Sequence, residues 1–125
     1  MKVNEIICEM THAELDQVEQ VADALWKNYD VDVEFTRHFF DRVNDPRNKT
    51  PITPDELIAL FKKEYAQYGR DIADFDSGGE AVLKDLFSKI NVPFVVSDRG
   101  RDRDLVMKTV MRKPNFATSN TEFKV

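Results

Sequence analysis

Two segments of the chain carry apolar residues at helical spacing, and the first of them begins at a capping box. Thr11 is followed three residues later by Glu14, a pair whose side chains satisfy free N–H groups at the start of a helix. The pattern predicts a helix over residues 12–29. Its apolar positions are Leu15, Val18, Ala22, Leu25, Trp26 and Tyr29.

The second segment repeats the same start signal. Thr53 and Glu56 form another capping box, and Pro54 occupies the first helical position, where its missing N–H is not needed. Apolar positions at helical spacing follow, and they predict a helix over residues 54–68. Gly69 is a typical helix stop, because glycine readily adopts the left-handed conformation found after a last helical turn.

Shorter elements are predicted between these two helices. Residues 31–35 alternate apolar and acidic side chains, as a half-buried strand does. Thr36 is a suitable N-cap for a short helix over residues 37–44. The turn-forming sequence Asn-Asp-Pro-Arg-Asn at residues 44–48 ends that helix.

Strand-like runs dominate the chain after the second long helix. They are predicted at residues 81–83, 90–96 and 105–111, with Gly100 at the tip of the hairpin that joins the last two. Pro93 lies inside the middle run. This position suggests an edge strand or a bulge, because proline cannot donate a hydrogen bond to a neighbouring strand.

Helices that precede strands in this way predict an α+β fold, with N-terminal helices packed on a C-terminal antiparallel β-sheet. The chain has 125 residues, of which 42% are hydrophobic and 33% are charged, and this composition suits one globular domain. We expect a single domain over residues 1–125, with residues 113–125 as a polar and only partly ordered tail.

The net charge of −5 argues against a general nucleic-acid coat, but the charges are unevenly distributed. Residues 1–83 hold nine Lys/Arg and 18 Asp/Glu, whereas residues 84–125 hold nine Lys/Arg and five Asp/Glu. A local anion-binding face is compatible with this distribution, and so is ordinary variation of surface charge.

Several classes of protein are disfavoured by what the sequence lacks. No apolar run is long enough for a membrane span or the core of a signal peptide, so we expect a cytosolic protein without a membrane partner. The single cysteine, Cys8, lies in an apolar run and is expected to pack rather than react. No nucleotide-binding loop or zinc motif is present, so no metal and no cofactor is expected.

His38 is the best candidate for acid–base chemistry. A helix places His38 and Arg42 on one face, and Arg47 follows just after that helix. An imidazole can take and give a proton near neutral pH, and arginine suits a phosphate group. Such a set fits metal-independent cleavage of RNA. The alternative is that His38 caps or packs, while Arg42 pairs with Asp41 or Asp45.

The last predicted strand adds further cations. Regular alternation places Lys108 and Arg112 on one face and Thr109 on the other. Two unpaired cations are costly to bury, so the first face is expected to be a basic, partly solvated surface. Arg99, Arg101, Arg103 and Lys113 extend this predicted surface. The alternative is a solvated face whose cations pair with local aspartates.

Three stretches together resemble a group of bacteriophage proteins. They are FTRHFFDRVNDPRN at residues 35–48, INVPFV at 90–95 and DLVMKTVMRKPNF at 104–116. The likeness extends over residues 10–120. The group is assigned to the Barnase–EndoU–colicin–RelE-like nuclease fold.

This resemblance implies a phage-encoded, metal-independent ribonuclease-like protein that cleaves RNA through the 2′-hydroxyl in the host cytoplasm. The catalytic positions of the fold group match His38, Arg42 and Thr109. Strand alternation conflicts with this set, because it turns Thr109 away from the other strand cations. RNA is expected to contact Arg47, Lys108, Arg112 and Lys113. The alternative is a non-enzymatic phage protein that binds and inhibits a host protein in a host takeover.

Overall fold

The computed structural model describes residues 9–125, so the prediction made for Cys8 lies outside the described residues. Helices come first along the chain and most strands afterwards, which confirms the predicted α+β class. The helices are α2 (His12–Trp26), α3 (Arg37–Val43) and α4 (Pro54–Ala73), with short 3₁₀ turns η1 (Lys27–Tyr29) and η2 (Pro46–Asn48). The strands are β1 (Val31–Phe35), β2 (Glu80–Lys84), β3 (Ile90–Arg99), β4 (Asp102–Met107), β5 (Met111–Arg112) and β6 (Thr121–Lys124).

The sheet is mixed rather than purely antiparallel. Its strand order is β1-β4-β3-β2-β6, and β5 pairs with β3 beyond the end of β4. The central strands β2, β3 and β4 are antiparallel neighbours, as predicted. The two edge strands run parallel to their neighbours, β1 beside β4 and β6 beside β2. Neither edge strand follows its neighbour directly in the chain, so a hairpin does not impose antiparallel pairing there.

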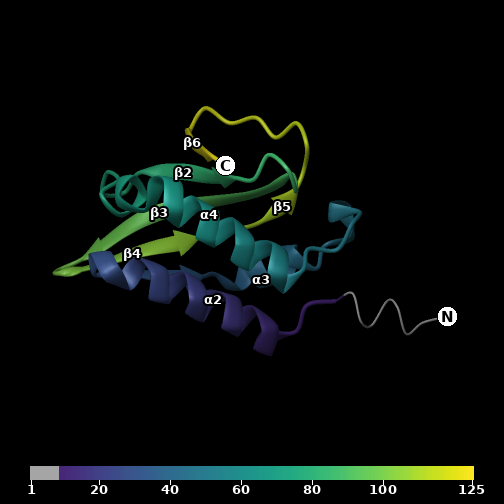
Figure 1. Cartoon of the computed structure of the whole chain (residues 1–125), viewed down its shortest axis with the longest axis horizontal. Helices are drawn as coiled ribbons and strands as arrows, with labels where there is room; N and C mark the ends of the chain where they lie inside the picture. Colours follow the sequence, from purple (N-terminus) through teal and green to yellow (C-terminus); the bar gives the residue numbers. More distant parts are fainter. Residues whose placement is uncertain (1–8) are drawn as a thin grey trace.

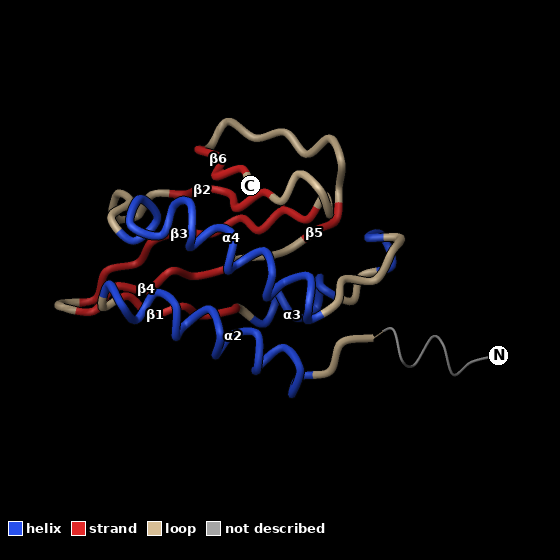
Figure 2. The backbone as a smooth tube through the Cα atoms, in the orientation of Figure 1, coloured by secondary structure: helices blue, strands red, loops and turns tan. Residues whose placement is uncertain are grey.

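The helices α2 and α4 lie side by side across one face of the sheet (Figures 1 and 2). The capping boxes predicted at Thr11 and Thr53 both form, which explains why these helices begin where the sequence placed them. At one end of the sheet, α3 and β5 lie near the turn between β2 and β3 (Figure 1). The Gly100 hairpin is at the other end.

Gly69 does not end the second long helix, which continues to Ala73. The reason is tertiary packing. The Trp26 indole donates a 3.0 Å hydrogen bond to the carbonyl of Gly69, and a Cβ at this position would meet the Tyr65 ring at 3.1 Å. Glycine at this position leaves room for the Tyr65 ring of the same helix and does not supply a left-handed conformation.

The exposed edge of β1 is blocked by acidic side chains from α2. The Val33 N–H donates to Asp23 at 2.9 Å, and the Phe35 N–H donates to Glu19 at 2.7 Å. Unpaired N–H groups on an edge strand invite pairing with another chain, and these carboxylates occupy them. Part of the negative charge in the first half of the chain thus has a structural role.

A bulge interrupts the last predicted strand opposite Pro93. Two residues of β3 separate the partners of Met107 and Met111, whereas three residues separate these methionines along their own chain. The Lys108 N–H donates to the Pro93 carbonyl at 2.9 Å. Of the two alternatives for Pro93, the bulge is the one that the structure shows, since β3 is a central strand.

The segment 113–125 is not a loose tail. It crosses from β5 to the far edge of the sheet, where β6 pairs with β2 (Figure 1). The Lys84 ammonium group fixes this crossing segment. It donates a 2.8 Å hydrogen bond to the Phe116 carbonyl and pairs with the Glu122 carboxylate at 3.0 Å. Polar composition alone gave no sign of these long-range contacts. Within residues 9–125, no helix combines the length and apolar character needed to cross a membrane.

Glu64 is a fully buried carboxyl group on the inner face of α4. One of its oxygens accepts the Lys84 N–H at 3.1 Å, while the other has no hydrogen-bond partner among the described residues. Burial raises the pKa of Glu64 to about 9, so the side chain is protonated at neutral pH.

We therefore expect the free energy of unfolding to fall as pH rises from about 5 to about 9. In this window the unfolded chain has lost the Glu64 proton and the folded protein retains it, which lowers stability by at most about 1.4 kcal/mol per pH unit. Glu64→Gln should remove this contribution. Urea titrations across the pH range measure it. The exposed substitution Asp71→Asn is the control, and parallel profiles for wild type and Glu64→Gln would contradict the prediction.

Candidate active-site cleft

A cleft of about 840 Å³ lies between the α3–η2 segment and the chain around β5. It receives six of the seven side chains singled out from the sequence, although they come from positions as far apart as residues 38 and 113. The predicted residues that line it are His38, Arg42, Arg47, Thr109, Arg112 and Lys113. Its other lining residues are Asp45, Asn48, Lys49, Thr50, Lys89, Val110, Met111 and Pro114.

His38 and Arg42 are in direct contact on α3. Thr36 caps this helix by accepting the Phe39 N–H, and the i, i+4 spacing then places both side chains on one face. Arg42 Nε donates to His38 Nε2 at 3.1 Å. Because arginine can only donate, Nε2 accepts, and the proton of the neutral imidazole is on Nδ1.

Asp45 joins the two arginines of this wall. It caps η2 by accepting the Arg47 N–H at 2.8 Å, and its carboxylate also binds the Arg47 guanidinium at 2.8 Å. Arg42 reaches the same carboxylate at 3.1 Å. The pairing of Arg42 with Asp45, an alternative in the sequence analysis, therefore occurs together with the contact to His38.

The bulge decides which strand residues reach the cleft. Regular alternation would have placed Thr109 and Arg112 on opposite faces of the strand. The extra residue of the bulge shifts this alternation by one position, and both side chains line the cleft. Lys108 is not among the lining residues, and its ammonium pairs with Glu80 at 2.9 Å. The expected basic face that contained Lys108 and Arg112 together does not form.

Two cations expected to extend that face are also neutralised. Arg99 pairs with Glu34 and with the buried Asp104. Arg103 pairs with Asp98 at 2.8 Å and also donates to the backbone carbonyl groups of Ala73, the last residue of α4, and Phe75. The interpretation that these strand cations pair with local aspartates is thus correct for Arg99 and Arg103, whereas Lys108 pairs with the distant Glu80.

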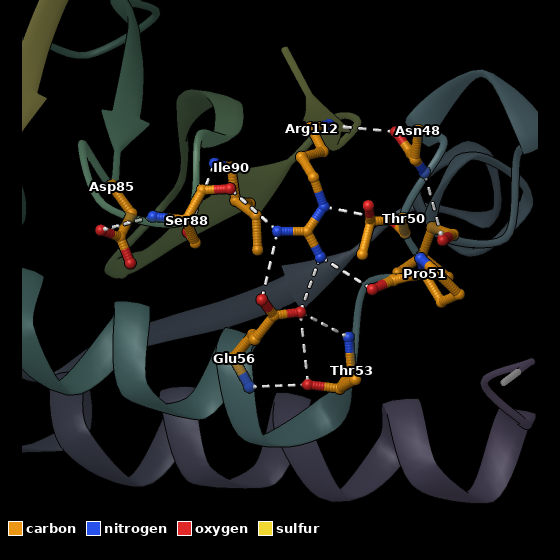
Figure 3. Close-up of polar contacts among 10 residues, drawn as sticks. Asn48, Thr50, Pro51, Thr53, Glu56, Asp85, Ser88, Ile90 and Arg112 are labelled. Carbon is orange, nitrogen blue, oxygen red and sulfur yellow. Dashed lines mark hydrogen bonds and ion pairs between the residues drawn. The ribbon is translucent and has the colours of Figure 1, made fainter. Parts of the chain in front are cut away.

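Arg112 is a structural residue, because all five of its guanidinium N–H groups have protein acceptors (Figure 3). Two bonds at 2.7 and 3.1 Å form a fork with Glu56 at the start of α4. The others reach the carbonyls of Thr50, Pro51 and Ser88 at 3.1, 2.7 and 2.8 Å. Arg112 therefore has no donor left for an RNA phosphate.

The electrostatics of Glu56 agree with this role. Burial opposes its ionisation, but the hydrogen bonds from Arg112 and from the Thr53 backbone outweigh that cost and lower the pKa of Glu56. The pair is therefore charged at neutral pH. It links α4 to β5 as well as to the two loops that flank the cleft.

Three lysines supply the unpaired positive charge of the cleft. Within the described part of the chain, Lys49, Lys89 and Lys113 form no ion pair, unlike the three arginines of the cleft. Lys89 and Lys113 are neighbours, since the Lys113 N–H donates to the Lys89 carbonyl at 2.9 Å. Lys49 belongs to the opposite wall, directly after η2.

Two of these lysines have backbone conformations that favour glycine. Lys89 has a φ of 66°, and Lys49 has a φ of 65° with a ψ of −58°. Around Lys49, the Thr50 N–H donates to the Asn48 carbonyl at 2.7 Å, which closes a strained γ-turn. Strained residues are common where a side chain has a function, and both of these side chains line the same cleft.

Two buried asparagines hold the cleft walls together. Asn48 accepts the Arg112 N–H at 3.0 Å and donates to the Arg42 carbonyl at 2.9 Å, so it joins β5 to the end of α3. Asn91 donates to the carbonyls of Lys89, Met111 and Lys113. The sequence offered one signal for Asn91, because it is a polar residue inside the otherwise apolar run of β3. No sequence signal marked Lys49 or Lys89.

A scan against protein-family models and searches of curated proteins and of solved structures found no match to this chain. The likeness to phage nuclease-like proteins stays a prediction from the sequence.

Arg112→Ala is expected to lower the free energy of unfolding by about 2–5 kcal/mol, because it removes five hydrogen bonds and leaves the Glu56 carboxylate without its partner. Arg112→Lys should recover only part of this loss, since an ammonium group cannot reproduce the fork. Chemical denaturation measures both values.

The neighbouring substitution Lys113→Ala is the matched control. Lys113 is exposed, so its removal should change stability by no more than about 0.5 kcal/mol. If Arg112→Ala were as stable as wild type but had lost its affinity for RNA, the structural assignment would be wrong.

Proposed function

We propose that the cleft binds the phosphodiester backbone of RNA and that His38 acts as the general base in metal-independent cleavage. The observation that carries this proposal is that His38, Arg42 and Thr109 line one cleft, together with three lysines that have no ion-pair partner within residues 9–125. A neutral imidazole, a planar cation and a cationic rim are the groups that this reaction needs. The phage origin and the host cytoplasm as its place of action rest on the sequence resemblance alone.

The contact between His38 and Arg42 suggests how substrate starts the reaction. An incoming phosphate competes for the Arg42 guanidinium, because charge-assisted bonds to phosphate are stronger than a bond to neutral imidazole. Once Arg42 turns to the phosphate, Nε2 of His38 is free to accept a proton. Asp45 keeps Arg42 within reach through their 3.1 Å ion pair.

The proposed step balances without a metal ion. His38 Nε2 takes the proton of the RNA 2′-hydroxyl, and that oxygen forms a bond to phosphorus. The bond from phosphorus to the 5′ oxygen breaks, and this leaving oxygen takes a proton from water. The products are a 2′,3′-cyclic phosphate and a 5′-hydroxyl end. Arg42 and the Thr109 hydroxyl stabilise the charge on the phosphate during the transfer.

Purified protein should cleave RNA in the presence of EDTA and leave cyclic-phosphate ends. His38→Ala is expected to reduce the rate by about 10²–10⁴-fold, the usual contribution of an acid–base residue. Arg42→Ala should have a comparable effect, and the double variant should be little worse, because the two residues act on one phosphate. End-labelled RNA on a denaturing gel measures both the rate and the ends.

Lys108→Ala is the control for these variants, since Lys108 lies outside the cleft. A strict requirement for magnesium would overturn the mechanism. Intact RNA together with specific capture of a host protein would favour the alternative, an inhibitor that is not an enzyme. Full activity in His38→Ala would show that His38 is not the base.

RNA binding should weaken as salt rises, because phosphate contacts release counterions. Lys49→Gly, Lys89→Gly and Lys113→Ala are each expected to reduce the slope of log affinity against log salt by about one unit. Glycine is used at the first two positions because their positive φ favours it, so folding is preserved.

Lys108→Ala and Arg101→Ala test whether these changes are local. Both side chains are exposed and lie outside the cleft, so the slope should stay as in wild type. Equal effects from all five substitutions would indicate diffuse attraction to the whole protein rather than binding in the cleft.

A further inference from the structure

Phe87 is the most exposed large hydrophobic side chain among residues 9–125. Its relative exposure is 91%, and it is followed by Leu86 at 53%. Both residues lie in the tight turn between β2 and β3, which spans residues 85–89. A phenyl ring in this position contributes little to the stability of the fold, because it has almost no contact with the core.

The turn that carries Phe87 is fixed rather than loose. The buried Asp85 accepts the Phe87 N–H at 3.0 Å and pairs with Lys63 at 2.9 Å. The Leu86 N–H donates to the Val125 carbonyl at 2.9 Å. Burial opposes ionisation of Asp85, but the hydrogen bonds from Lys63 and the Phe87 N–H outweigh it and lower its pKa. The ring is therefore presented to solvent by an ordered backbone.

The same turn forms part of the cleft. The Ser88 carbonyl, directly after Phe87, accepts a 2.8 Å hydrogen bond from the Arg112 guanidinium (Figure 3). Lys89, the next residue, lines the cleft and carries one of its unpaired charges. An exposed aromatic ring thus stands two residues from a cation that is available to a phosphate.

We propose that Phe87 is a stacking platform for an unpaired nucleobase, and that the cleft therefore selects single-stranded RNA over duplex RNA. The proposal rests on the proposed function, because it places the sugar–phosphate backbone of that strand beside Lys89 and Lys113. Adjacent aromatic and cationic groups are the arrangement by which proteins hold single strands without reading their sequence. In a duplex the bases are stacked on one another and cannot reach the ring.

The charge around the turn favours a nucleic acid over an apolar protein surface. The nearby lysines Lys89 and Lys113 have no acidic partner in the described chain, and a hydrophobic partner would have to bury or displace these charges. A polyanion neutralises them while its base covers the ring.

Binding is tested by fluorescence anisotropy with a short 2′-O-methyl RNA strand, which cannot be cleaved, and with the same strand annealed to its complement. Wild type should prefer the single strand. Phe87→Ala should lose about five- to 100-fold in affinity for the single strand and little for the duplex. Phe87→Trp should keep the preference for the single strand, because indole also stacks on a base. The neighbouring control Leu86→Ala should bind as wild type does.

The outcomes separate the two proposals. If wild type binds the single strand and Phe87→Ala binds it equally well, the stacking role is overturned and RNA binding stands. If wild type binds neither RNA form, both proposals fail. Sedimentation velocity completes the test, because a wild-type dimer that Phe87→Ala dissolves would show that the ring contacts a second copy of this chain, which overturns the proposal. If wild type binds the 2′-O-methyl single strand but does not cleave unmodified RNA, only the catalytic role of His38 is contradicted.

Discussion

The five hydrogen bonds of Arg112 are the interaction on which the candidate site depends. They connect a two-residue strand to the start of α4, to the loop after η2 and to the turn between β2 and β3. The loop after η2 and the turn both border the cleft, and neither belongs to a long regular element. A mostly buried guanidinium with every donor satisfied holds these short segments in one relative arrangement, whereas solvated loops would adopt many.

The cations of the cleft fall into two classes, according to whether they pair with a carboxylate. Its three arginines all pair with carboxylates, Arg112 with Glu56 on one side and Arg42 and Arg47 with Asp45 on the other, and of the three Arg42 also contacts His38. Its lysines lack such partners in the described chain, and two of them occupy positions where the backbone favours glycine. The planar fork of arginine suits fixed bidentate contacts, whereas lysine is a flexible point charge that can follow a mobile polyanion. The division of labour thus follows from the chemistry of the two side chains.

Local signals in the sequence predicted the local structure well. The capping boxes at Thr11 and Thr53 and the i, i+4 pair of His38 and Arg42 depend on neighbours within one helical turn, and all of them form. The errors arose where distant residues decide. The Trp26 indole, 43 residues away in the chain, binds the Gly69 carbonyl inside α4, and no pattern around Gly69 reveals this contact.

The cleft itself could be predicted only in part, because its composition depends on one extra residue opposite Pro93. Periodicity assigns Lys108 and Arg112 to one face, and without the bulge Thr109 would point away from both. The missing N–H of Pro93 indicated that strand pairing is interrupted there. How many extra residues the bulge contains, and so which side chains change face after it, depends on the register in which β5 pairs with β3. Once that pairing is known, the conflict between the Thr109 motif and the strand cations disappears. Thr109 joins His38 in the cleft, and Lys108 pairs outside it with Glu80.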